Sequence, residues 1–131
     1  MSRELYFDSL FIWIAVAFIA FFILLFFKPS TYGRHINLNR LSISNKWGWF
    51  LMEIPAILIV VFFLSGTLDF NIVTTFFIFL YVIHYINRVF VFPFRLQTKG
   101  KKIPLLIVMS AIFFNLCNTF FIGYYFGHFA T

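Results

Sequence analysis

The sequence predicts an all-α integral membrane protein with four transmembrane helices. Of its 131 residues, 63% are hydrophobic and 11% are charged, whereas soluble domains are about half apolar and about a quarter charged. The apolar residues fall in four blocks of spanning length that are separated by short polar links. A transmembrane β-barrel would show short segments of alternating hydrophobicity instead, and the sequence has none. We therefore expect a single transmembrane unit.

The four spans are expected at about 9–27, 47–64, 71–92 and 103–126. The first is longer than the core of a secretory signal peptide and is not followed by a small-residue cleavage site, so it is predicted to be retained. Lys28 and Pro29 end this span, and Pro93 closes the third. Pro55, in the first turns of the second span, is expected to free a backbone carbonyl near Glu53.

The basic residues predict the orientation of the chain in the membrane. Nearly all of them fall in the first and third links, and none lies in the second link or at the C-terminal end. By the positive-inside rule, the first and third links face the cytoplasm and both termini are non-cytoplasmic. The same rule explains the net charge of +6 without a nucleic-acid partner. Cys117 stands alone, so no intramolecular disulfide is possible and the redox compartment is not indicated.

Glu53 is the acidic residue that the sequence places inside the hydrocarbon region. The other acidic residues, Glu4, Asp8 and Asp69, lie at expected segment ends. A carboxylate at this depth loses hydration, so it is expected to be protonated, paired or facing a polar cavity. The structural alternative is a glutamate that snorkels to the interface or caps a neighbouring helix.

A polar stripe on the third span lies at a matching depth. Its members are spaced by three and four residues, which places them on one helix face: Tyr81, His84, Tyr85 and Arg88. At helical rise Tyr85 lies roughly 10 Å deep, about the depth of Glu53. The stripe alone would also fit a packed interhelical network with Arg88 snorkelling to the headgroups. Together with the carboxylate it predicts a functional site that faces protein or a water-filled cavity.

Four motifs follow one another along the chain: residues 28–35 (KPSTYGRH), 49–55 (WFLMEIP), 84–88 (HYINR) and 99–105 (KGKKIPL). Together and in this order they resemble motifs of the steroid 5α-reductase family (3-oxo-5α-steroid 4-dehydrogenases). Asn118 followed by Gly123-Tyr124-Tyr125 is similar to the fourth-span motif. The resemblance covers nearly the whole chain. Because family members are about twice as long and have seven spans, the resemblance implies the first half of a seven-helix bundle.

The resemblance implies NADPH-dependent reduction of a carbon–carbon double bond conjugated to a ketone in an apolar lipid, a 3-oxo-Δ4 steroid. Negative charge develops on the ketone oxygen, which needs hydrogen-bond donors already in place. By match to the motifs, Glu53, as a neutral acid, and Tyr85 are the expected catalytic donors. Trp49, Phe114 and Asn118 are the expected substrate-binding residues. Placement within the membrane would let an apolar substrate enter from lipid.

The same resemblance predicts little of the cofactor pocket in this half. Arg88, Lys99 and Lys101 are candidates to contact a cofactor phosphate, and the positive-inside rule is the alternative explanation for them. No Gly-rich turn is present to hold a pyrophosphate. The main NADPH pocket is therefore expected in a C-terminal half or a partner chain. No metal site is predicted, because the three histidines are far apart and lack a Cys or carboxylate cluster at ligand spacing.

Departures from the family pattern keep two questions open. Met52 stands where the best-known members carry glutamine, and Thr119 and Ile122 replace the glycine and glutamine of the fourth-span motif. A conjugated fatty-acyl or isoprenoid substrate would use the same carbonyl chemistry. A different class of function is also open: the chain would be a catalytically inactive truncated membrane protein or a partner subunit. NADPH binding by the chain would distinguish an enzyme from these alternatives.

Overall fold

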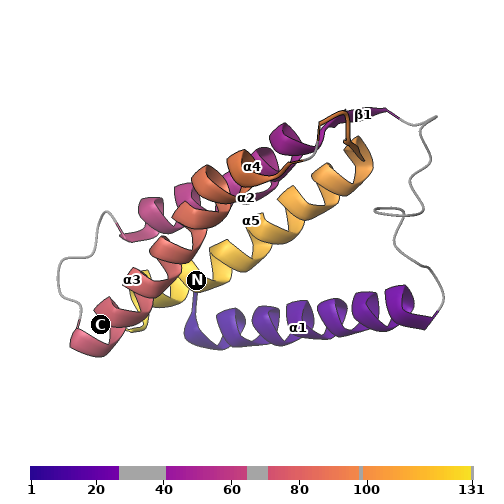
Figure 1. The fold of residues 1–131 in the computed structure, drawn as a ribbon. Coiled ribbons are helices and arrows are strands. Elements are labelled where there is room, and N and C mark those ends of the chain that lie inside the picture. The colour runs from indigo at the N-terminus through magenta and orange to yellow at the C-terminus, as the bar shows by residue number, and fades with distance from the viewer. Residues whose placement is uncertain (27–40, 65–70, 98, 131) are drawn as a thin grey trace. The chain divides into compact units, whose positions relative to one another are not determined.

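The computed structural model describes residues 1–26, 41–64, 71–97 and 99–130 (Figure 1). The predictions for residues 28–35 and for the link at Asp69 lie outside these described residues. The chain divides into two units, residues 1–37 and 38–131. The four helical segments of the described chain that are long and apolar enough to cross a membrane run over Arg3–Phe26, Asn45–Phe62, Ile72–Arg95 and Leu105–His128. The predicted fold class is confirmed.

The first unit contains helix α1 (Arg3–Phe26), which begins before the predicted start of the first span. The hydroxyl oxygen of Ser2 accepts a hydrogen bond from the backbone N–H of Leu5 at 3.3 Å. This bond satisfies one of the free donors that every helix start exposes. Glu4 lies in the first turn, where the positive end of the helix dipole favours an acidic side chain.

The second unit is built on helices α2 (Asn45–Leu64), α3 (Ile72–Ile86) and α5 (Leu105–His128). Helices α2 and α5 start at the same end and run side by side in the same direction, so that Gly48 lies against Val108 and Met52 against Asn115 (Figure 1). Helix α3 runs the opposite way. Its first turn reaches the end of α5, where the hydroxyl of Thr74 donates to the carbonyl of Ala130 at 3.1 Å.

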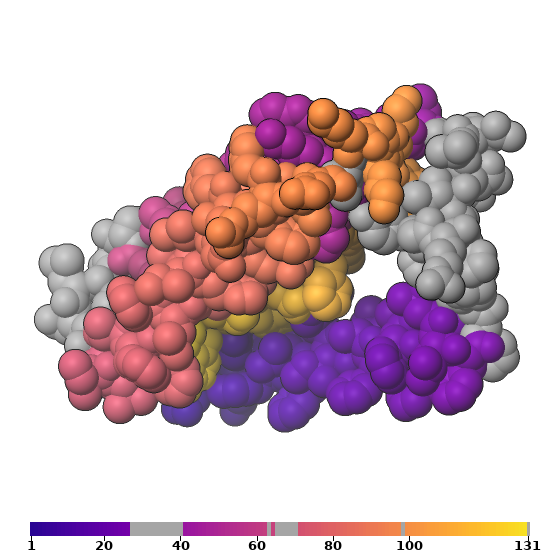
Figure 2. Space-filling model, in the orientation of Figure 1, coloured from indigo at the N-terminus to yellow at the C-terminus, as the bar shows by residue number. Residues whose placement is uncertain are grey.

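The third span continues past Pro93, which corrects the expectation that this proline closes it. After α3 the chain makes a π-helical turn, η2 (Asn87–Val91), and then the short helix α4 (Phe92–Arg95). A proline removes a backbone donor, and its ring crowds the carbonyl four residues earlier. The wider π turn before Pro93 accommodates both effects, so the helical segment continues to Arg95 instead of ending at the proline. Figure 2 shows α3, η2 and α4 as one continuous layer of atoms in front of α2.

A two-stranded antiparallel sheet, which the sequence did not predict, fixes the starts of α2 and α5. Strand β1 (Ser42–Ser44) pairs with β2 (Lys102–Pro104), with Ile43 opposite Ile103. The pairing continues at both ends: the N–H of Asn45 donates to the carbonyl of Lys101 at 3.0 Å, and the N–H of Leu105 donates to that of Leu41 at 2.8 Å. Because each strand leads directly into a helix, the sheet sets the register between α2 and α5.

Gly100 permits the turn before β2. Its φ of +78° lies in the left-handed region, which side chains other than glycine rarely adopt. Around this turn the described basic residues of the second unit gather, apart from Arg88: Lys46, Arg95, Lys99, Lys101 and Lys102. The ammonium of Lys46 lies 4.0 Å from the ring centroid of Phe94. The charge is thus concentrated at one end of the unit, and the side of the membrane that this end faces stays a prediction.

We expect Gly48→Ala to destabilise the second unit. A Cβ at position 48 would collide with the Cγ2 methyl of Ile103, which is buried and β-branched and so cannot rotate away cheaply. Overpacking of this kind typically costs about 1–3 kcal/mol. Thermal unfolding of the purified protein in detergent measures the loss. The double variant Gly48→Ala/Ile103→Ala removes the colliding methyl and is expected to lose less stability than the sum of the two single losses. If the two losses simply add, the contact between Gly48 and Ile103 does not limit how closely α2 approaches the sheet.

Candidate functional site

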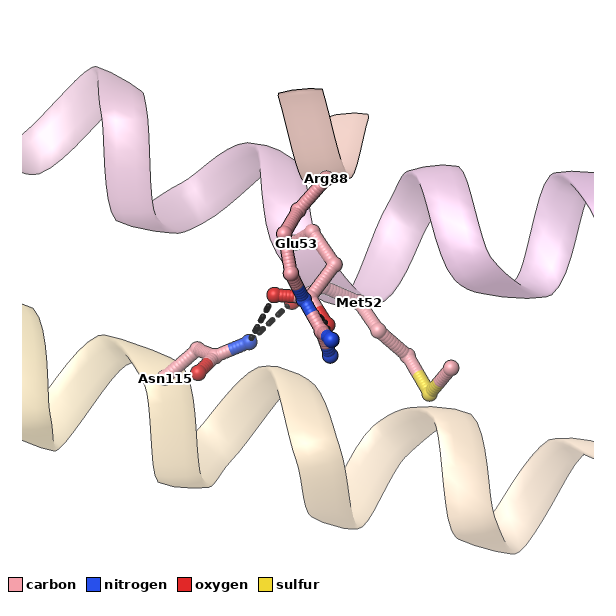
Figure 3. Close-up of polar contacts among 4 residues, drawn as sticks. All are labelled: Met52, Glu53, Arg88 and Asn115. Atoms are coloured by element: carbon pink, nitrogen blue, oxygen red, sulfur yellow. Dashed lines mark hydrogen bonds and ion pairs between the residues drawn. The ribbon is translucent and has the colours of Figure 1, made fainter. Parts of the chain in front are cut away.

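Glu53 forms an ion pair with Arg88 inside the second unit. The guanidinium donates twice to the same carboxylate oxygen, from Nε at 3.1 Å and from Nη2 at 2.5 Å to Oε1 (Figure 3). The side chain of Glu53 is 7% exposed and that of Arg88 is 37% exposed. Of the three possibilities for an intramembrane carboxylate, the structure therefore shows pairing. Hydrogen bonds between charged groups are about twice as strong as neutral ones.

A third helix reaches the same carboxylate. Asn115 on α5 points across to α2, where its Nδ2 donates to the backbone carbonyl of Met52 at 2.6 Å and approaches Oε2 of Glu53 at 3.5 Å (Figure 3). Pro55 lies three residues further along α2 and lacks the N–H that would bond the carbonyl of Leu51. The interhelical bond is thus made beside the turn where the backbone of α2 has lost a donor.

Two aromatic rings hold the guanidinium of Arg88 over the carboxylate. Its Cζ lies 5.2 Å from the ring centroid of Trp49 and 5.8 Å from that of Phe92. The two rings contact each other edge to face, with centroids 5.2 Å apart. Arginine is attracted to the face of aromatic rings within about 6 Å. Trp49, one of the expected substrate-binding residues, therefore lies at the site beside Arg88.

Tyr85 lies on the same side of the third span as Arg88. Its phenol interacts electrostatically with both Glu53 and Arg88. Its ring lies 4.5 Å from that of Tyr81, tilted by 39°. The hydroxyl of Tyr81 shares a hydrogen bond with Oγ1 of the fully buried Thr119 at 3.2 Å. The predicted polar stripe thus does face protein at these positions.

Known proteins with similar sequences include steroid 5α-reductases, the family that the motifs resemble. No family model matches the chain. The chain is 32% identical over 134 residues to a steroid 5α-reductase of Solanum lycopersicum, an alignment that covers 98% of the chain and 52% of the relative. It is 28% identical over 103 residues to 3-oxo-5-alpha-steroid 4-dehydrogenase 1 of Homo sapiens, covering 76% of the chain and 39% of the relative. These relatives are steroid 5α-reductases, and the chain is similar to about half of each. It spans about half the length of the curated relatives it matches, consistent with the N-terminal half of the family.

The remaining predicted residues lie further from the ion pair. Phe114 is exposed on α5 and Asn118 is half-buried one turn further along. Lys99 and Lys101 are exposed in and after the turn that precedes β2, at the sheet end of the unit. His84 is exposed, with its ring against the edge of Tyr85. Substrate and cofactor roles for these residues stay predictions.

Asn115 is the residue of the site that the motifs did not indicate. Inward-facing positions of α5 recur every four residues at Asn115, Thr119 and Gly123. An amide in the middle of an apolar span is costly without a partner. That signal was present in the sequence, but only the position of α2 relative to α5 shows that its partners are Met52 and Glu53.

Proposed function

We propose that this chain is the N-terminal half of an enzyme that reduces the carbon–carbon double bond of a conjugated ketone in an apolar lipid, a 3-oxo-Δ4 steroid. The observation that carries the proposal is the buried carboxyl group of Glu53, with polar partners from the third span and from α5. Ionisable groups inside a membrane are costly, and they mark functional sites. The family relation supports a steroid substrate.

The reaction needs donors at the ketone oxygen. Hydride adds to the β-carbon, negative charge moves to the oxygen, and a proton then adds at the α-carbon. Donors held in place for the enolate lower this barrier. The hydroxyl of Tyr85 is one proposed donor. Glu53 is the other: we propose that the carboxylate that pairs with Arg88 takes up a proton before it donates to the ketone oxygen. Because Arg88 donates twice to Oε1, the oxygen proposed to take up and carry this proton is Oε2.

NADPH is part of the proposal, as the hydride donor that the family relation implies. The described residues do not by themselves fit a dinucleotide. Arg88 is already bonded to Glu53, and Lys99 and Lys101 lie in the exposed stretch before β2, at the sheet end of the unit. We place the cofactor pocket in the remaining half of the enzyme or in a partner chain, and the proposal assigns to these residues only the polarisation of the ketone.

The test uses the native gene product in its own membrane, with a tag at the N-terminus. Incubation with NADPH and a 3-oxo-Δ4 steroid is expected to give a product heavier by two hydrogen atoms, detected by mass spectrometry. A conjugated isoprenoid ketone serves as the competing substrate. A product of 15.6 kDa that neither binds NADPH nor reduces either ketone would refute the proposal. That result would favour the second candidate, an inactive membrane protein or partner subunit, which the half-length match to the relatives also permits.

Tyr85→Phe is expected to lower kcat of steroid reduction by about 10²–10³-fold, the usual cost of removing one preorganised donor. The ring and its packing on Tyr81 are kept, so protein yield should not change. Tyr81→Phe makes the same change one turn earlier, where the hydroxyl bonds Thr119, and is expected to cost far less. Equal kcat in wild type and Tyr85→Phe would show that Tyr85 only packs.

A further inference from the structure

We propose that Asn115 is a positioning residue that fixes Oε2 of Glu53 as the proton-carrying oxygen. This inference rests on the proposed function and deepens it, because it says which atom of Glu53 acts and what holds that atom in place. Asn115 acts through Glu53, without a contact to the substrate.

The two oxygens of Glu53 differ in their partners. Oε1 accepts both bonds from Arg88, at 3.1 and 2.5 Å. Among the residues that the structure describes, Oε2 has one contact, a long one at 3.5 Å with Nδ2 of Asn115. A carboxylate has about four acceptor sites, two on each oxygen. Oε2 therefore retains the capacity to take up a proton or to bond a substrate, whereas Oε1 is used by the guanidinium.

Asn115 is anchored independently of Glu53. Its Nδ2 donates to the carbonyl of Met52 at 2.6 Å, a short bond to the backbone residue directly before Glu53. An amide nitrogen carries two hydrogens in one plane. With one hydrogen directed at the backbone of α2, the other is aimed at a fixed place beside it. The Asn115 side chain thereby holds Oε2 at a fixed position relative to the backbone of α2, next to the turn in which Pro55 removes a backbone hydrogen bond.

This arrangement explains why an amide is needed at position 115. Leucine has the same number of side-chain heavy atoms, branched at the same carbon, but no donor, so it would leave both the Met52 carbonyl and Oε2 without their partner from α5. The carboxylate would still bond Arg88, and it could turn about that bond. Misplacement of a catalytic group by about 1 Å can cost about 10²-fold in rate.

The experiment is a double-mutant cycle in the native enzyme, with Asn115→Leu made in the wild type and in Glu53→Gln. In the wild type, Asn115→Leu is expected to lower kcat by about 10–100-fold while KM stays within about twofold. In Glu53→Gln it is expected to cause no further loss, because there is no longer a proton to position. Ser110→Ala, on the exposed side of α5 where the hydroxyl bonds only its own helix, is the control and should match the wild type.

An equal loss of kcat in both backgrounds would overturn the positioning role, since Asn115 would then act independently of Glu53. A second readout does not need the reaction. Thermal unfolding of the same four proteins should show that the two losses in Tm are not additive, because the residues share one contact. Additive losses overturn the contact itself. Coupled Tm values in a protein that reduces no ketone would refute the proposed function, and the catalytic part of this inference with it, while the contact would stand.

Discussion

Glu53→Gln is expected to lower kcat of ketone reduction by about 10²–10³-fold in the native enzyme, with little change in protein yield. Glutamine has nearly the same shape and keeps a carbonyl oxygen that can accept the bonds that Arg88 now gives to Oε1. It has no acidic proton to place at the ketone oxygen. The expected signature is therefore loss of kcat with KM almost unchanged, measured by steady-state kinetics on membranes with equal amounts of tagged protein.

Glu4→Gln is the matched control for this variant. It makes the same chemical change at an exposed position in the first turn of α1 and should leave kcat at the wild-type value. Full turnover by Glu53→Gln would remove Glu53 from the reaction and leave the ion pair as a packing element. If yield and total activity fall together, kcat per molecule is unchanged. Glu53 would then stabilise the helix bundle without taking part in the reaction.

The depth of polar residues along each span was enough to predict which helices meet at the site. Helical rise alone put Glu53 and Tyr85 at about the same level, and in the structure the two are near enough to interact electrostatically. It could not decide what Arg88 bonds. A long side chain near a helix end can snorkel to the headgroups, reach a phosphate or turn inward to a carboxylate. That choice depends on the rotation of the third span about its axis, which is set by packing against α2.

The features that the sequence did not predict are those set by contacts between distant segments. Strands β1 and β2 are three residues long, too short to show an alternating pattern, and each exists because the other lies beside it. Pro93 predicts a helix end, because a proline in a helix interior usually breaks or kinks it. A π turn before it lets the span continue to Arg95, and this places Phe92 against Trp49 and Arg88. The correction therefore bears directly on the site.

Asn115 was missed for a related reason. The family motifs pointed to Phe114 and Asn118, its neighbours on α5. On a helix, residues one position apart face different directions, and residues three positions apart share a face but lie about one turn apart, so a small error in facing side or in depth selects a different residue. The close approach of α2 and α5 at Gly48 and the sheet register at Ile103 determine that it is Asn115 that meets α2.

Arg88→Met is expected to destabilise the second unit by about 3 kcal/mol, the lower end of the cost of removing one partner from a buried ion pair. Methionine keeps an unbranched apolar stem against Trp49 and Phe92, so the packing on both rings is largely preserved. The carboxylate of Glu53 would be left with the single long contact from Asn115. Thermal unfolding in detergent, supported by protein yield in membranes, measures the loss.

A second substitution distinguishes the cost of an unpaired Glu53 carboxylate from the cost of lost packing on the aromatic rings. Arg88→Met/Glu53→Gln removes the unpaired charge and is expected to recover most of the lost Tm, because a neutral amide costs less to bury than a carboxylate. Arg95→Met, at the exposed last turn of α4, is the control for removing an arginine from this span and should leave Tm near the wild-type value. If Arg88→Met keeps the wild-type Tm, the pair contributes nothing to the folded state. If the double variant stays as unstable as the single one, the arginine stabilises the fold through the aromatic rings, and its charge is then available for the substrate or the cofactor.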